Sequence, residues 1–530
     1  MVTKNLVIIL FYCALNLISN IVFSSTNLGT INTIQNGFAT IDECSNNLNS
    51  ASNDCENLLD IQLSGILTLP TTNECIASNA QIKASGHKIP KCPKSINELK
   101  GLDNTHPNGG IFALYTGNND SFIYDLLSNY LKDGSGKFNL VLPKANIYKL
   151  INNPQLIKIL NNKRINIVEV NTTPKVDRWM QDSFQFTSFN GKPAIYQLEH
   201  FRESGINFED RLACLLAKKC NIPYYIPADM VDVMNANDSS LNSGGNLEVL
   251  PGGTFYRGII KSEGYPLHVN DSNSKLPWQS KAQKIQKLAL ENAGNKVLDL
   301  DTSFLNVAHV DEIINIVKTN QPAPCNFAVL LASPEKAFEL MDKSVANLAN
   351  SSNSNKNKCK NTSYINLVNE GKYSVITDER IAQIYSMNCI DNLPIDEFVK
   401  SKEYTILKRE NLKDDVPKSI NKIMKENEQL IVRELKESSG CQNPKVIPFP
   451  VFFRDGLSYT PDLVNGVVQS PAGSPSKVIL PRSYFAPFDN YVQDELAKFG
   501  VKTTFAHDMG YHLLFGEVHC GTNSARICEP

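Results

Sequence analysis

Short apolar runs alternate with amphipathic stretches along the chain from Gly109 onward. The runs that predict strands are bounded by turn-forming residues and span 111–115, 138–141, 165–170, 296–300 and 327–332. Apolar residues at three- and four-residue spacing predict helices over 275–292 and 334–349. Strands that alternate with helices are typical of the α/β class, which is therefore the predicted fold class. No internal repeat is visible in the sequence.

Residues 1–24 have the pattern of a secretory signal peptide. Lys4 is followed by an uninterrupted apolar run over 6–15, and small residues precede the expected cleavage site. A membrane anchor is the alternative, but polar residues from Asn16 onward interrupt the run before the roughly 18 to 20 apolar residues that a spanning helix needs. We therefore expect a secreted protein without stable insertion into a membrane.

Residues 25–108 are polar and predict a small disulfide-containing N-terminal region ahead of a larger α/β region over 109–530. The N-terminal cysteines are Cys44, Cys55, Cys75 and Cys92. In an oxidising compartment most of the cysteines should pair. Glycosylation is a further expectation, from sequons at Asn119, Asn171, Asn237, Asn270, Asn350 and Asn361.

Charge and composition exclude some partners. The 530 residues include 52 basic and 54 acidic side chains, giving a formal net charge of -2, so no overall positive field attracts nucleic acid. The apolar content of 42% and the charged content of 20% are those of an ordinary globular protein. We expect no nucleic-acid partner.

Four separate segments concentrate reactive side chains: DRWMQD at 177–182, NSGGNLE at 242–248, HVDE at 309–312 and GEVHCGTN at 516–523. On a strand, His309 and Asp311 would point to the same face and could serve as a base and a carboxylate for one substrate. Taken singly, three of the segments have other interpretations. DRWMQD also fits a solvated loop, NSGGNLE a turn that binds a phosphate or a cation, and HVDE a histidine satisfied in the core. Cys520 alone could be a nucleophile, a disulfide partner or a metal ligand, although the spacing does not fit zinc.

Taken together and in this order, with LLASP at 330–334, these segments resemble the catalytic domain of the peptidylarginine deiminases. The resemblance implies the pentein fold, a pseudo-fivefold α/β propeller around a central site, for residues 109–530. It also implies conversion of peptidyl arginine to citrulline and ammonia through a thiouronium intermediate. The expected substrates are therefore arginine-containing proteins or peptides.

The resemblance assigns a role to individual residues. Asp182 and Asp311 match the carboxylates that bind the guanidinium, His309 the general acid and base, and Cys520 the nucleophile. Trp179 matches the aromatic wall over the substrate side chain, and Arg202 the arginine that holds the peptide carbonyl. A guanidinium is a planar cation, so carboxylates to bind it, a thiol and a proton carrier form a chemically sensible set.

The resemblance also implies a calcium site, with departures. The ligand positions are Gln181, Gln185, Gly244, Leu247 and Glu248. Gln185 stands where the family has a carboxylate, so we expect Ca²⁺ as a cofactor but with an affinity weakened toward ~10⁻⁴ to 10⁻³ M. Leu514 stands where several members have a second substrate-facing arginine.

Three alternatives to a secreted protein-arginine deiminase remain. A deiminase of free arginine or small guanidines would use the same fold, and an inactive secreted calcium-binding pentein would keep the shape without turnover. A Cys/His protease is the third. We further expect Cys520 to be a free thiol, and Cys528, near the C-terminus, to be the other unpaired cysteine or to form an intermolecular bond.

Overall fold

The computed structural model describes a defined part of the chain, and all of that part belongs to one compact unit, Leu59–Pro530. The predicted signal peptide and Cys44, Cys55 and Cys92 lie outside the described residues. Among the helices that are described, none is long and apolar enough to span a membrane. The described residues are 75–76, 99–133, 136–171, 178–189, 191–198, 211–225, 243–261, 281–349, 389–390, 393–413, 418–512 and 514–528.

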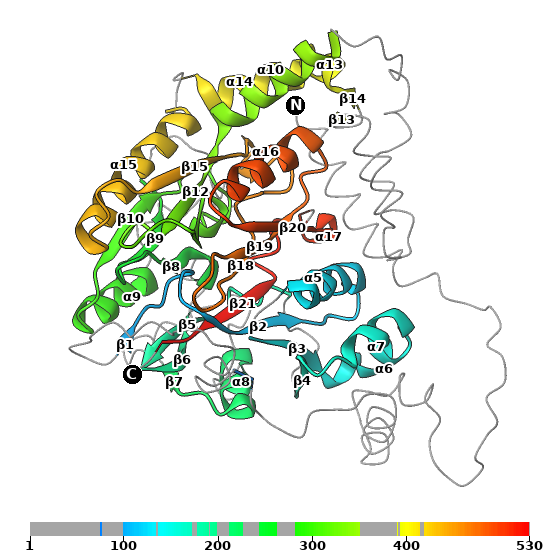
Figure 1. Ribbon diagram of the computed structural model, residues 1–530, viewed down its shortest axis with the longest axis vertical. Coiled ribbons are helices and arrows are strands. Elements are labelled where there is room, and N and C mark those ends of the chain that lie inside the picture. The colour runs from blue at the N-terminus through cyan, green and yellow to red at the C-terminus, as the bar shows by residue number, and fades with distance from the viewer. Residues whose placement is uncertain are drawn as a thin grey trace, which may run out of the picture. The chain divides into compact units, whose positions relative to one another are not determined.

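The described strands form seven separate sheets, and five of these contain the same three-strand module (Figure 1). In each module the first two strands are antiparallel and the third is parallel to the second. Because parallel strands need a crossover rather than a tight turn, helices connect the second strand to the third. We number these modules 1 to 5 by the order of their central strands.

Each module is described by its three strands and its connecting helices. Module 1 is β21 (Thr522–Arg526), β2 (Asn108–Leu114), α5 (Asp120–Asp133) and β3 (Lys137–Pro143), extended by α6 (Ile147–Ile151), α7 (Pro154–Leu160) and β4 (Ile165–Val170). Module 2 is β5 (Phe184–Phe189), β6 (Lys192–Gln197), α8 (Leu212–Cys220) and β7 (Tyr224–Tyr225), with β1 (Leu99–Lys100) beside β5. Module 3 is β8 (Leu247–Val249), β9 (Phe255–Ile259), α9 (Lys281–Asn292) and β10 (Val297–Asp301). Module 4 is β11 (Ile314–Lys318), β12 (Phe327–Ser333), α10 (Pro334–Ala349), α14 (Lys402–Leu412), α15 (Ile420–Ser438) and β15 (Lys445–Pro450). Module 5 is β18 (Val467–Gln469), β19 (Lys477–Pro481), α16 (Ala486–Ala497) and β20 (Lys502–Ala506).

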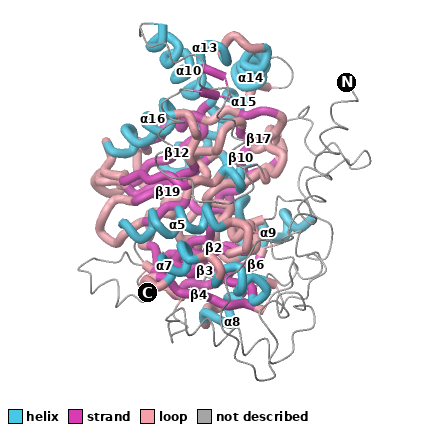
Figure 2. The backbone as a smooth tube through the Cα atoms, turned by 90° about the vertical axis from the view of Figure 1, so that its right-hand side faces the viewer, coloured by secondary structure: helices cyan, strands magenta, loops and turns pink. Residues whose placement is uncertain are grey.

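The first strand of module 1 is the last strand in the sequence, because β21 pairs with β2 (Figure 1). The end of the chain thereby completes the sheet that its early part begins. Residues 99–100 also join a module, through β1 on β5. Figure 2 shows the helices α5, α7 and α16 lying over the strands.

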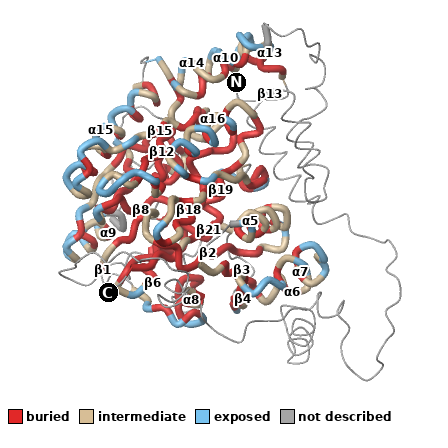
Figure 3. Tube along the Cα trace, in the orientation of Figure 1, coloured by how far each residue is buried: buried red, intermediate tan, exposed pale blue. Residues whose placement is uncertain are grey.

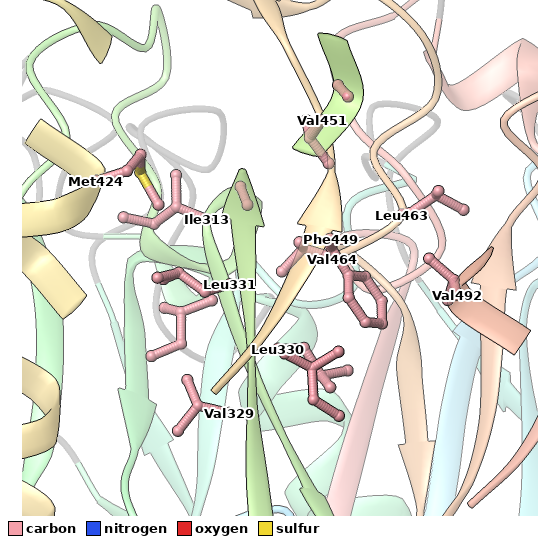
Figure 4. Packing of buried hydrophobic residues seen from close by; sticks show 14 of the residues in the cluster. Ile313, Val329, Leu330, Leu331, Met424, Phe449, Val451, Leu463, Val464 and Val492 are labelled. Atoms are coloured by element: carbon pink, nitrogen blue, oxygen red, sulfur yellow. The ribbon is translucent and has the colours of Figure 1, made fainter. Parts of the chain in front are cut away.

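The LLASP segment is the junction between a buried strand and its crossover helix. β12 is almost continuously apolar because it lies in the middle of its sheet, between β11 and β15. Ser333 Oγ accepts a hydrogen bond of 3.2 Å from Lys336 N, and Pro334 occupies the first helical position, where its missing N–H costs nothing. Figure 4 shows Leu330 directed toward Val492 of α16 and its neighbour Leu331 toward Met424 of α15, the alternation expected of a strand covered on both faces.

Apolar cores join the modules in cyclic order. One core is shared by modules 1 and 2, a second by modules 2 and 3, a third by modules 3, 4 and 5, and a fourth by modules 5 and 1. In the last of these, Phe138 and Leu140 of β3 lie in one cluster with Val467 and Ile479 of module 5. Figure 3 shows that burial is concentrated on the strands, while the helices expose their outer faces.

The predicted α/β class is confirmed. The strand predicted over 165–170 is β4, the helix predicted over 334–349 is α10, and the other predicted strands correspond to β2, β3, β10 and β12 within a few residues. The helix predicted from residue 275 is described from Lys281 onward. The propeller part of the prediction is not confirmed, because the modules are separate sheets and the described strands form no closed sheet.

The described disulfides connect distant parts of the chain. Cys75 pairs with Cys220 of α8, and Cys325 pairs with Cys441. Cys520 is a free thiol, as expected. The expectation for Cys528 is wrong: it is buried behind β21 and disulfide-bonded, and the second free cysteine of the described chain is Cys214 on α8.

One of the predicted glycosylation sites does not fit the structure. Asn119 is buried, and its Nδ2 donates hydrogen bonds of 2.8 Å to Leu114 O and to the Tyr511 hydroxyl. A glycan on this nitrogen would disrupt both bonds. Asn171 is exposed, and the remaining sequons lie outside the described residues.

Candidate active site

A turn precedes the first strand of every module, and these turns carry the reactive segments found in the sequence. The turns are 179–183 before β5, 243–246 before β8, 309–313 before β11, 462–466 before β18 and 517–521 before β21. Each turn occupies the same place in its module, and hydrogen bonds join the five turns to one another.

Hydrogen bonds connect these turns in a closed cycle, which we call the hydrogen-bond ring. Each bond joins a turn to the turn of a neighbouring module, and most of the acceptors or donors belong to buried residues. The bonds are Gly244 N to Asp182 O (3.1 Å), Val310 N to Asn246 Oδ1 (3.1 Å), Asn465 Nδ2 to Asp311 O (3.2 Å), Cys520 N to Asn465 Oδ1 (3.2 Å) and Gln181 N to Cys520 O (3.1 Å).

Cys520 is held between an amide and a carboxylate. Its Sγ lies 3.6 Å from Asp311 Oδ2 and accepts a hydrogen bond of 3.3 Å from Asn465 Nδ2. Burial, with added repulsion from Asp311 and Asp182, raises the pKa of the Cys520 thiol well above its usual value. A raised pKa favours the neutral thiol, and a cation beside these carboxylates would favour the thiolate.

Asp182, Asp311 and His309 converge on the backbone of Gly245. A β-carbon at Gly245 would lie 2.8 Å from His309 Nδ1, 3.1 Å from Asp311 Oδ2 and 3.2 Å from Asp182 Oδ1, so only glycine leaves room for these groups. His309 Nδ1 also lies 3.7 Å from Asp182 Oδ1. Asp311 Oδ1 is buried and has no hydrogen-bond partner among the described residues, which leaves it able to accept one.

The expectation that His309 and Asp311 lie on a strand is wrong. His309 precedes a single 3-10 turn, Val310–Glu312, and β11 begins after it. Ala308 has a left-handed φ of 54°, and Val310 N is bound by Asn246, so the backbone turns before the sheet starts. The two side chains nevertheless reach the same centre, through the turn rather than through strand alternation.

His519 lies between the carboxylates of Asp311 and Glu248. Its Nδ1 lies 2.8 Å from Asp311 Oδ2, and its Nε2 lies 3.5 Å from Glu248 Oε1. Burial lowers the pKa of His519, but the hydrogen bond to Asp311 and the charge of Glu248 outweigh burial and leave the pKa above its usual value. Burial raises the pKa of Glu248 to about 7.

The side chains that the resemblance assigns to calcium lie together. Gln181 Nε2 donates hydrogen bonds of 3.0 Å to Gln185 Oε1 and of 3.0 Å to Glu248 Oε1, so these two oxygens both face the Gln181 side-chain nitrogen. The carbonyl of Gly244 accepts a hydrogen bond from Leu247 N in the same turn. No group of three or more His, Cys, Asp or Glu side chains in the described chain is arranged to hold a metal, and this set contains a single carboxylate.

Trp179 is buried beside Gly516, in the turn that leads to Cys520. Its ring meets the Tyr511 ring edge-on, with the ring centroids 5.3 Å apart. The Arg178 guanidinium lies over the same Tyr511 ring, 5.4 Å from its centroid. A β-carbon on Gly516 would come within 2.4 Å of the Trp179 ring. Arg202, the remaining predicted site residue, lies outside the described residues.

A second group of buried carboxyls includes Glu517 of the 517–521 turn. Glu517 Oε1 accepts a hydrogen bond of 3.1 Å from Asp462 N and lies 2.7 Å from His512 Nδ1. Burial raises the pKa of Asp508 and of Asp462 well above the usual value, and raises that of Glu517 to about 8. Around these turns buried carboxyl groups far outnumber buried cationic side chains, which favours a positively charged ligand.

Sequence reasoning missed Asn465, whose side-chain amide hydrogen-bonds to the backbone of Asp311 and to both the backbone and the sulfur of Cys520. Its Oδ1 accepts hydrogen bonds from both His519 N and Cys520 N, at 3.1 and 3.2 Å. A signal was present: Asn465 and a glycine precede the short apolar strand β18, much as Gly245 and Asn246 precede β8. This similarity can be recognised only once β8 and β18 are known to be the first strands of equivalent modules.

Asn465→Asp should raise the pH at which Cys520 becomes reactive, because a carboxylate replaces the amide that donates to the sulfur. We expect the pH profile of Cys520 alkylation by iodoacetamide to move up by about one unit or more. Peptide mapping measures this rate. Asn427→Asp is the matched control, since Asn427 is an equally buried amide that bonds the backbone of Asp301 instead. An unchanged profile in Asn465→Asp would contradict the proposed contact.

Glu517→Gln should stabilise the fold at alkaline pH. The pKa of Glu517 is raised by burial from 4.5 to about 8, so the folded chain holds a proton that the unfolded chain has lost within that window. The free energy of unfolding therefore falls as the pH rises from 4.5 to 8. Removing this ionisation should recover about 1–3 kcal/mol at the upper end, measured by thermal unfolding across the window. Glu437→Gln, at a 60% exposed side chain, is the control; stability curves of Glu517→Gln parallel to wild type would refute the assignment.

Comparison with known sequences places the chain among relatives that it matches only in part. It is 28% identical to rat protein-arginine deiminase type-3 over 310 residues, which are 55% of this chain and 38% of that protein. It is 26% identical to human protein-arginine deiminase type-4 over 301 residues, 54% of this chain and 38% of that protein. The chain thus spans well under half the length of these relatives.

Solved structures of low sequence identity resemble the chain over most of its length. The agmatine deiminase of Enterococcus faecalis is 11% identical with a TM-score of 0.44, covering 83% of this chain and 100% of that one. The agmatine deiminase of C. jejuni is 12% identical with a TM-score of 0.41, covering 82% and 97%. Scores below 0.5 do not by themselves establish a common fold. The profile of the family "Protein-arginine deiminase (PAD)", by contrast, matches residues 147–529, well over half of the chain, and the chain therefore belongs to the protein-arginine deiminase family.

Proposed function

We propose that this protein is a secreted, calcium-dependent protein-arginine deiminase that converts peptidyl arginine to citrulline and ammonia. The observation that carries the proposal is the placement of Cys520, whose thiol lies 3.6 Å from the Asp311 carboxylate inside a buried, carboxylate-rich centre. Family membership supports the same activity.

Asp182 and Asp311 bind the guanidinium in this proposal. A guanidinium presents its N–H groups in a planar fork, which suits two carboxylates on either side. Asp311 Oδ1 has no hydrogen-bond partner in the described chain, and the Asp182 and Asp311 carboxylates both lie close to Gly245. Because the centre has an excess of buried carboxyls, a bound cation would stabilise it rather than compete with it.

Binding of the cation also prepares the nucleophile. The carboxylates that raise the pKa of Cys520 are the ones that the guanidinium neutralises, so the substrate lowers the cost of forming the thiolate. Asn465 Nδ2 donates to the sulfur and stabilises its charged form. The sulfur is then available to attack the guanidinium carbon.

The reaction needs one proton carrier in two steps. His309 takes the proton of the Cys520 thiol as Sγ attacks the central carbon and forms a C–S bond; a C–N bond then breaks, and ammonia leaves with that proton. This leaves a cationic thiouronium on Cys520. His309 next accepts a proton from water, and the resulting hydroxide attacks the same carbon. The C–S bond breaks, the hydroxyl proton passes to the departing sulfur and restores the thiol, and citrulline forms. In sum, the arginine guanidinium and water become citrulline and ammonium, since the proton left on His309 goes with the released ammonia.

We infer that the five modules form the pentein propeller that the resemblance predicts. The repeated strand pattern, the cores shared in cyclic order and the hydrogen-bond ring support this arrangement. The disulfides Cys75–Cys220 and Cys325–Cys441, with the signal-like residues 1–24, support secretion, since disulfides persist in oxidising compartments.

A direct assay tests the activity. Purified protein is incubated with a blocked arginine amide and with free arginine, and the ureido product is measured. We expect turnover of the blocked amide, none in Cys520→Ala, and a loss of about a hundredfold or more in Asp311→Asn, since the buried guanidinium then keeps only one of its two carboxylates. Asp455→Asn, at a 79% exposed side chain, is the control.

The outcomes of that assay separate the alternatives. Equal or better turnover of free arginine would favour the small-guanidine deiminase. No turnover of either substrate, with calcium bound, would favour the inactive calcium-binding protein.

The residues fit a calcium ion in part. Gln181, Gln185 and Glu248 would hold it with side-chain oxygens, and Gly244 and Leu247 with backbone carbonyls. When bound, calcium supplies positive charge beside Glu248. The single carboxylate predicts a weak site, because affinity rises with the number of charged ligands.

Calcium should bind in the millimolar range and raise the Tm, since a ligand of the folded state stabilises it. Gln185→Glu adds a carboxylate and should tighten binding by about tenfold or more. Glu248→Gln removes the only carboxylate and should weaken it. Calorimetry and thermal unfolding measure both effects without an activity assay. If calcium leaves the Tm unchanged up to 10 mM, roughly tenfold above the expected range, the cofactor assignment is wrong.

A further inference from the structure

Two large apolar side chains are exposed on the turn that leads to the nucleophile. Leu514 is 39% exposed and Phe515 is 53% exposed. The described chain has one other exposed large apolar side chain, Leu288 on α9. Adjacent exposed apolar residues on an otherwise polar surface often mark an interaction site.

The backbone holds this pair outward at an energetic cost. After α17 (Met509–His512), Leu514 N donates a hydrogen bond of 2.8 Å to Tyr511 O, and Phe515 N donates one of 3.0 Å to His512 O. Phe515 has a left-handed φ of 70°, a conformation that is uncommon for an aromatic residue and is usually left to Gly or Asn. Strain of this kind persists only where the surrounding structure fixes it.

The exposed pair is continuous with the candidate active site. The next residue, Gly516, lies so close to the Trp179 ring that a β-carbon would come within 2.4 Å of it. Trp179 packs edge-on against Tyr511, the residue that anchors the turn. The chain from Phe515 reaches Cys520 in five residues, while the pair itself remains at the surface.

We propose that Leu514 and Phe515 bind an apolar side chain next to the target arginine of a peptide substrate. This inference rests on the proposed function. Cys520 and Asp311 are almost fully buried, so the arginine side chain must extend inward and leave the peptide backbone at the surface. A neighbouring residue of that peptide then lies over the exposed pair, where burial of two apolar surfaces favours binding. The preferred substrate is thus an arginine flanked by an apolar residue.

Matched peptides test the preference. Blocked peptides that differ in one residue, Leu, Ser or Asp, on either side of a single arginine are compared by kcat/KM, with the blocked arginine amide as a reference. We expect the Leu peptide to exceed the Ser peptide by about five- to tenfold on at least one side. In the double variant Leu514→Ser and Phe515→Asn, that ratio should fall to within about twofold. Asn is used at position 515 because it tolerates the left-handed φ.

Leu288→Ser is the control, because it removes an exposed leucine on α9 and should keep the wild-type ratio. A wild-type ratio near one, or a ratio that survives in the double variant, overturns the inference while turnover of the amide upholds the proposed function. Absence of amide turnover overturns the proposed function, and calorimetry of the same peptides on Cys520→Ala then decides the preference by affinity. Dimerisation that the double variant abolishes, together with a wild-type ratio near one, would assign the pair to a second copy of the chain.

Discussion

The site depends on the closure of the hydrogen-bond ring. Five turns far apart in the sequence bond to one another in a cycle, from Gly244 through Asp311 and Asn465 to Cys520 and Gln181. The last bond connects the turn before β21 to an early module, and β21 itself pairs with β2, so the position of Cys520 depends on contacts far away in the sequence. Buried backbone groups that would otherwise lack partners are satisfied in this ring, which explains why the turns cannot shift independently.

The same arrangement also places many carboxyl groups close together. The ring gathers carboxyl groups in a buried place, and burial, with added repulsion from neighbouring carboxylates, raises the pKa of Glu248, Glu312 and Cys520. His519 offsets part of this charge by lying between Asp311 and Glu248. A centre of this kind is better suited to a guanidinium than to an uncharged peptide bond, which argues against a Cys/His protease. In the proposed reaction, the charge of the substrate contributes both to binding and to activation of the thiol.

The α/β class and the positions of most of the reactive residues could be predicted from the sequence. Strand β4 and helix α10 have strong periodicity and a clear cap at Ser333, so local pattern sufficed. The repeat could not be seen, because a module is defined by strand pairing and crossover rather than by residue identity. Asn465 was missed for the same reason, and the 3-10 turn at His309 follows from a tertiary bond to Asn246. Cys528 was misassigned because its burial behind β21 depends on long-range pairing.

The central claim is that Cys520 is activated by a cation held against Asp311. The most direct measurement compares alkylation of the intact protein by chloroacetamidine, a cationic reagent, with alkylation by neutral chloroacetamide, using peptide mapping to follow Cys520 and Cys214, the other free thiol of the described chain. The account predicts that Cys520 reacts at least about tenfold faster with the cation, that Cys214 shows no such selectivity, and that Asp311→Asn abolishes it. Equal rates with the two reagents, or selectivity that persists in Asp311→Asn, would contradict it.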